Sequence, residues 1–130
     1  MNPNDYRVWL QFAEEDLDSA QLITEKSNHY RQACFLIQQS VEKSIKACYV
    51  KTNQQFLKTH DLNALRDQLN YNFLWKKVYP NLSQFIVYAV EARYPGDWEE
   101  IDFEEANSLL LVAKKILESI KKELSADLTP

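Results

Sequence analysis

The sequence predicts an all-α protein, an antiparallel bundle of four to five helices. Three long segments place apolar residues three and four positions apart, which is the spacing of one helix face, and no segment alternates convincingly with a period of two. The 130 residues include a single glycine. That composition argues against a turn-rich β fold and against a glycine-rich phosphate loop. We therefore expect one helical domain that spans residues 1–130.

The first helix is expected to begin between Asn2 and Asn4, where asparagine can cap it and Pro3 is tolerated, and to end near residues 26–29. Its inner seam has helical spacing and is flanked by Phe12 and Leu17. The seam consists of Tyr6, Trp9, Ala13, Asp16, Ala20 and Ile23.

Asp16 is the exception in this apolar seam. A buried carboxylate must find a cation or hydrogen-bond donors, or else remain protonated. One interpretation is a helix rotated far enough for Asp16 to reach water. The other is a buried pair with Lys43, His60 or Arg93.

The second helix is expected from about Asn28 to Lys51 and is apolar on one face. That face contains Tyr30, Cys34, Ile37, Val41, Ile45 and Cys48. The opposite side carries a polar strip, defined as Gln39, Glu42, Lys43 and Lys46, with Phe35 one turn before it. Glu42 and Lys46 form a favourable i, i+4 pair. The strip is either a solvated helix face or a surface that holds a phosphate, a base or a second subunit.

The rest of the chain contains a loop, two shorter helices and a long last helix. Thr59 or Asp61 can cap a short helix over residues 62–69. A fourth helix is expected to start at residues 80–81, with Leu82, Phe85, Ala89 and Ala92 on one face, and to stop at "RYPGDW" (93–98). The last helix is expected from about residue 102 to residue 124. Its apolar stripe is Phe103, Ala106, Leu110, Ala113, Leu117, Ile120 and Leu124.

Charge and composition limit the function classes. Fifteen Lys and Arg against 19 Asp and Glu, with a pI of about 5.2, give no electrostatic signature of nucleic-acid or membrane-surface binding. No apolar run approaches the roughly 20 residues that span a bilayer, and no signal peptide is evident, so we expect a cytoplasmic protein. Cys34 and Cys48 repeat among apolar residues and are expected to be core thiols. The spacing of cysteines and histidines predicts no zinc site, and we expect no cofactor.

Two further segments carry candidate binding residues. His60 precedes a helix start in "KTHDL", where it either caps or packs locally, or contacts an anion at the helix N-terminus. In "RYPGDW", Arg93 can bind a phosphate with two hydrogen bonds or pair with an acid inside the bundle. No nucleophile and base stand at a spacing that predicts catalysis.

Three motifs together resemble the HEPN domain family of prokaryotes and higher eukaryotes. They are "W-x3-A-x2-DL-x2-A" over residues 9–20, "QQSVEKSIKA" followed by "THDL", and "ARYPGDW". The resemblance covers nearly the whole chain. It implies a helical bundle that pairs into a homodimer and binds a nucleotide, often beside a separately encoded minimal nucleotidyltransferase in a toxin–antitoxin-like pair.

The resemblance also implies the roles of individual residues. The nucleotide- or anion-binding candidates are Gln39, Lys43, Lys46, His60, Arg93 and Tyr94, supported by Asp16, Glu42 and Pro95. Ribonuclease branches of the family carry an arginine followed after four to six residues by histidine, and no arginine of this chain has a histidine in that window. We therefore expect a non-catalytic module. The alternative is a divergent, metal-independent ribonuclease that acts on RNA with His60 and Arg93.

Overall fold

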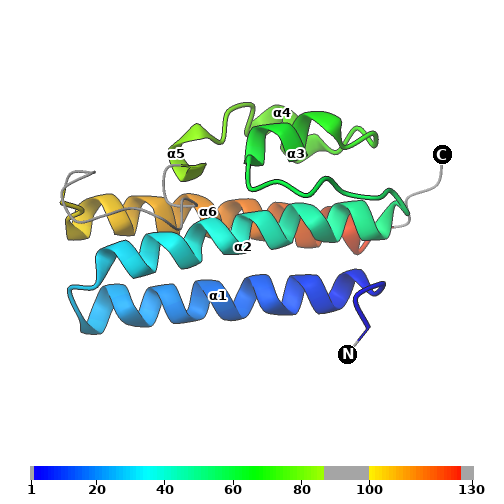
Figure 1. Cartoon of the computed structure of the whole chain (residues 1–130). Helices are drawn as coiled ribbons and strands as arrows, with labels where there is room; N and C mark the ends of the chain where they lie inside the picture. The colour runs from blue at the N-terminus through cyan, green and yellow to red at the C-terminus, as the bar shows by residue number, and fades with distance from the viewer. Residues whose placement is uncertain (1, 87–99, 127–130) are drawn as a thin grey trace.

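The computed structural model describes residues 2–86 and 100–126, and in those ranges the chain forms six helices and no strand. Three of them are long: α1 (Tyr6–Lys26), α2 (Tyr30–Lys51) and α6 (Phe103–Leu124). Figure 1 shows these three side by side, with the short helices layered on one side of α2 and α6. The predicted all-α bundle is confirmed.

The long helices begin where polar side chains accept first-turn amides. Asp5 accepts from the backbone N–H of Arg7, so α1 starts just after the expected Asn2–Asn4 window. Asp102 accepts from the backbone N–H of Glu105 at the start of α6, where the acidic first turn also suits the helix dipole. α2 begins at Tyr30, and its N-cap residue His29 makes no side-chain capping hydrogen bond.

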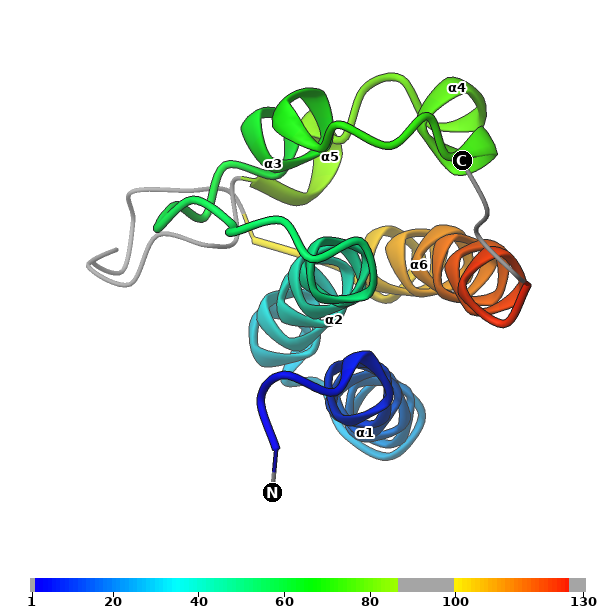
Figure 2. The same cartoon turned by 90° about the vertical axis from the view of Figure 1, so that its right-hand side faces the viewer.

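The core lies between the three long helices, with α2 in the middle. Figure 2, viewed along the bundle, shows α2 between α1 and the layer of short helices, with α6 beside it. The predicted apolar faces largely form this core. Its predicted members that are buried include Ala13, Leu17, Ala20, Cys34, Ile37, Val41, Ile45, Cys48, Ala106, Leu110, Ala113, Leu117, Ile120 and Leu124. Phe103 was expected in the stripe of the last helix, but 45% of it is exposed because it stands at the first residue of α6.

The short helices are α3 (Leu62–Gln68), α4 (Leu74–Val78) and α5 (Ser83–Ile86). Asp61 caps α3 by accepting from the amides of Asn63 and Ala64, as the sequence predicts. The expected fourth helix is described only as the four residues of α5, which start at Ser83 rather than at residues 80–81. The rest of that prediction, including Ala89 and Ala92, lies outside the described residues.

The helix α4 was not predicted. Its N-cap position, Phe73, offers no side-chain acceptor. The carboxylate of Glu123, near the end of α6, accepts instead from the backbone N–H groups of Leu74 (2.7 Å) and Trp75 (3.0 Å). A distant acid therefore caps this helix.

The segment after α2 turns back over it. Asn53 adopts a left-handed backbone conformation with φ of 61°, which asparagine tolerates better than most residues. Gln54 then donates to the carbonyl of Gln68 and accepts from the amide of Asn70, which ties the loop to the end of α3. This path brings Phe56 and His60 to α2.

Two predictions on composition can be compared with the described residues. Cys34 and Cys48 are both buried as thiols and are not joined in a disulfide, as expected of core cysteines. Among residues 2–86 and 100–126, no helix has the length and hydropathy to cross a membrane.

Candidate functional site

Glu42 is the centre of the candidate site, and it is buried. The sequence places it on the side of α2 opposite the core, but only 5% of its side chain is exposed. Of the two alternatives that the sequence left open for the strip, a solvated face does not apply to Glu42, because the loop after α2 folds over this part of the helix and brings His60 to within 2.9 Å of the carboxylate.

Three side chains surround the Glu42 carboxylate. Lys46 donates to Oε2 at 3.0 Å, Gln38 donates to Oε1 at 3.2 Å, and His60 Nδ1 lies 2.9 Å from Oε1. Burial by itself raises the pKa of Glu42. The hydrogen bonds from His60, Lys46 and Gln38 and the charge of Lys46 outweigh that effect and lower the pKa below its ordinary value. Glu42 is therefore held as a carboxylate.

Asp16 pairs with Lys43 across the interface of α1 and α2. Lys43 Nζ lies 2.7 Å from Asp16 Oδ2, and their side chains are 29% and 17% exposed. The pair forms because α1 and α2 pack closely, as the hydrogen bond from the Ser40 hydroxyl to the carbonyl of Ala13 also shows. Of the candidate partners of Asp16 that the structure describes, Lys43 and His60, it is Lys43 that pairs with Asp16.

Aromatic rings accompany each lysine of this region. Lys46 Nζ lies 5.0 Å from the ring centroid of Phe56 and 6.0 Å from that of Trp9. Lys43 Nζ lies 6.0 Å from the ring centroid of Phe12. These distances fall within the range of cation–π attraction. Rings of this kind also offer apolar surface to a planar ligand.

Gln39 completes the polar strip. Its side-chain amide donates to Gln38 Oε1 at 2.7 Å, so the two glutamines form a chain that ends at the Glu42 carboxylate. Gln39, Lys43 and Lys46 are half-buried, and none of them is fully solvated. The interpretation of the strip as a plain solvated face therefore does not fit these residues.

Some of the predicted site residues lie close together in the structure, and others lie outside the described residues. Asp16, Gln39, Glu42, Lys43, Lys46 and His60 lie together along α2. Arg93, Tyr94 and Pro95 lie outside the described residues. Gln38 and Phe56 were missed by sequence reasoning. Gln38 precedes Glu42 by one helical turn, and this spacing is the only sequence signal for its role.

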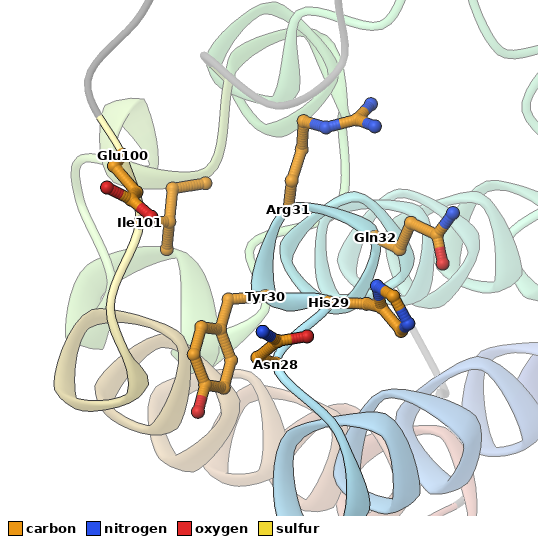
Figure 3. A pocket seen from close by; sticks show the side chains of 7 residues that line it. All are labelled: Asn28, His29, Tyr30, Arg31, Gln32, Glu100 and Ile101. Atoms are coloured by element: carbon orange, nitrogen blue, oxygen red, sulfur yellow. The ribbon is translucent and has the colours of Figure 1, made fainter.

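A separate cavity of about 210 Å³ lies at the other end of α2 (Figure 3). Side chains around the α1–α2 turn and the start of α6 line it: Asn28, His29, Tyr30, Arg31, Gln32, Glu100 and Ile101. None of the predicted site residues is among them. Within the part of the chain that the structure describes, no group of His, Cys, Asp and Glu could hold a metal ion.

Comparison with known proteins adds the family context. The family model of the HEPN domain matches residues 6–124. A protein of Methanocaldococcus jannaschii named "Putative toxin MJ1304" is 28% identical over 131 residues, which cover 88% of this chain and 85% of that protein.

Two solved structures share the fold. The crystal structure of TT1696 from Thermus thermophilus matches with a TM-score of 0.79 and 25% identity, over 92% of this chain and 98% of that one. The crystal structure of ST0689, an archaeal HEPN homologue, matches with a TM-score of 0.69 and 23% identity, over 95% and 99% of the two chains. The second of these likenesses bears on the fold alone.

Proposed function

The chain belongs to the HEPN domain family, and we propose that it acts as a non-catalytic module that binds a nucleotide at the polar strip of α2. The observation that carries the proposal is the pair of lysines one helical turn apart, Lys43 and Lys46, each held by a carboxylate and placed against aromatic rings. Positioned ammonium groups bind phosphate through charge-assisted hydrogen bonds. The rings of Trp9, Phe12 and Phe56 supply apolar surface for a base.

Calorimetric titration with ADP tests this site. The wild type is expected to bind ADP, and Lys43→Ala is expected to weaken binding at least about tenfold, because a hydrogen bond to a charged group contributes about 1.5–3 kcal/mol. Lys115→Ala is the matched control, since Lys115 is an exposed lysine of α6 away from the strip. Absence of ADP binding to the wild type, or an equal loss in Lys115→Ala, would contradict the proposal.

We further propose that the module acts as a homodimer. Its support is that Phe35 and Leu36, on the side of α2 that carries the strip, are only half-buried in one protomer. Apolar surface beside a polar site is typical of an interface. Light scattering at micromolar concentration is expected to give the mass of a dimer, and a monomer there would refute this part of the proposal.

A separately encoded minimal nucleotidyltransferase is the proposed protein partner, in a toxin–antitoxin-like pair. The support is membership of the family together with the name of the archaeal relative, which describes a toxin. Tagged protein purified from its native host is expected to retain a small nucleotidyltransferase that mass spectrometry identifies. Recovery of the tagged chain without such an enzyme would count against the pair.

A metal-independent ribonuclease is the second candidate function, and one observation favours it. Glu42 fixes Nδ1 of His60 at 2.9 Å, while 59% of the His60 side chain is exposed. A carboxylate that orients one imidazole nitrogen leaves the other free for proton transfer. Without the Arg-x(4-6)-His motif, we expect that the isolated protein does not cleave RNA.

An assay on transfer RNA and single-stranded RNA without added metal separates the two candidates. His29→Ala provides the control, because His29 is exposed at the start of α2 and contacts none of the strip. Cleavage that disappears in His60→Ala and persists in His29→Ala would establish the second function and refute the first.

A further inference from the structure

The two lysines of the strip are held by carboxylates in very different ways. Lys46 pairs with Glu42, which is 5% exposed and also accepts from Gln38 and His60. Lys43 pairs with Asp16, which is 17% exposed. Within residues 2–86 and 100–126, Lys43 provides the one side-chain donor to Asp16. Asp16 is therefore the less firmly held of the two carboxylates.

This difference determines from which lysine a ligand can displace the carboxylate. Displacing Glu42 from Lys46 would leave a buried carboxylate short of a charged partner, which is strongly unfavourable. Displacing Asp16 from Lys43 costs less, because the Asp16 side chain is 17% exposed against 5% for Glu42 and keeps more contact with water. Lys43 is consequently the lysine of the strip whose carboxylate partner a ligand can replace.

We propose that Asp16 is a competing carboxylate that occupies Lys43 until a ligand phosphate displaces it, and that the ligand carries at least two negative charges. This inference rests on the proposed nucleotide site and adds the class of ligand: a di- or triphosphate group. The charge requirement follows from the exchange itself. A monoanion that replaces Asp16 substitutes one negative charge for another and gains little.

A second negative charge on the ligand finds donors close to Lys43. The Lys46 ammonium has three N–H donors, and in the described part of the chain it donates to one oxygen, that of Glu42. Lys46 lies one turn beyond Lys43 on the same helix, and its side chain is 15% exposed. A diphosphate can thus take Lys43 from Asp16 and contact Lys46 while Glu42 stays in place.

The test is a titration with inorganic pyrophosphate, which isolates the phosphate contribution from that of a base. Asp16→Asn keeps the shape of the side chain and an oxygen acceptor but removes the competing charge. It is expected to bind pyrophosphate about three- to tenfold more tightly than the wild type. This range assumes that breaking the Lys43–Asp16 pair costs more than breaking an exposed ion pair and less than breaking a buried one. Asp18→Asn removes the same charge from an exposed position two residues away and is expected to change affinity less than about twofold.

Two further arms complete the test. In a Lys43→Met background, Asp16→Asn is expected to give no gain, because the cation for which the ligand and Asp16 compete is gone. Acetate, a monoanion, is expected to compete with pyrophosphate no better than chloride at the same ionic strength.

Each outcome decides between the possibilities. If the wild type binds ADP and pyrophosphate but Asp16→Asn binds pyrophosphate no more tightly, the inference fails while the nucleotide site stands. An equal gain in Asp18→Asn would reduce the effect to overall charge and also overturn it, and strong competition by acetate would overturn the charge requirement. If no variant binds ADP or pyrophosphate, the site and the inference fail together.

Discussion

Replacing Glu42 with glutamine should destabilise the protein, although the two side chains have the same shape. The carboxylate of Glu42 accepts from Gln38, Lys46 and His60 with its two oxygens. A glutamine has one oxygen and one NH2 group. At least one of the three donors would then face another donor, and the charge of Lys46 would lose its counter-ion.

The size of the effect follows from the burial of the partners. Removing one member of a fully buried ion pair costs about 3–5 kcal/mol. Glu42 is 5% exposed and Lys46 is 15% exposed, but His60 is 59% exposed and can turn to water. We therefore expect Glu42→Gln to lower the free energy of unfolding by about 2–3 kcal/mol at neutral pH, just below the fully buried case.

Urea unfolding followed by circular dichroism measures this change. Glu118→Gln is the control, since the Glu118 side chain is 74% exposed on α6, and it should alter stability by less than about 0.5 kcal/mol. The pH dependence gives a second test. Because the folded-state pKa of Glu42 is lowered from the ordinary 4.5, its contribution is complete above that value and is lost as the pH falls through the folded-state pKa. The gap between wild type and Glu42→Gln should therefore narrow in acid.

Two results would refute this reasoning. One is a Glu42→Gln variant as stable as the wild type at neutral pH, which would mean that the carboxylate contributes nothing to folding. The other is a stability gap that stays constant from neutral pH to below the ordinary pKa of the carboxyl group, which would trace the loss to packing rather than charge.

Two other predictions concern the layer of short helices and the core. Glu123→Ala should speed amide hydrogen exchange in residues 74–78 and lower the free energy of unfolding by about 1 kcal/mol, as loss of a helix cap does. Glu118→Ala is the control and should leave that exchange unchanged. Equal exchange in both variants would show that α4 does not depend on Glu123. Burial raises the pKa of the Cys48 thiol and keeps reagents away from it, so a thiol reagent should modify Cys48 only after unfolding. Rapid labelling of the native protein would contradict this and show that this part of the core opens easily.

The long helices could be predicted because their information is local. Each repeats apolar residues at helical spacing for about twenty positions, and polar residues such as Asp5 and Asp102 stand at or beside the point where the helix begins. Asp61 marked the start of α3 in the same way. A pattern contained within one segment is readable without knowledge of the fold.

The helix α4 could not be predicted for the opposite reason. It spans five residues, and its cap comes from Glu123, 49 positions after Leu74 in the sequence. Its fully buried member, Trp75, gives no periodic pattern by itself. Only the packing of α4 against the end of α6 supplies the missing acceptor.

Only part of the residues around Glu42 could be named from the sequence, and their arrangement could not be predicted. Glu42 and Lys46 have the spacing of an ordinary surface pair, and nothing in that spacing reveals that a later loop buries the carboxylate. Asp16 was recognisable as a carboxylate that needed a partner, and Lys43 was among the alternatives. The choice of Lys43 depends on how α1 and α2 pack along their length, which is a tertiary property.

The most direct test of a nucleotide site on the polar strip is nuclear magnetic resonance of isotopically labelled protein titrated with ADP. The largest shifts are predicted for the amides of residues 39–46 on α2, of residues 9–16 on α1 and of His60, with smaller shifts elsewhere in the described chain. Shifts confined to the outer face of α6 or to the cavity around the α1–α2 turn, or no shifts at saturating ADP, would contradict this placement of the site.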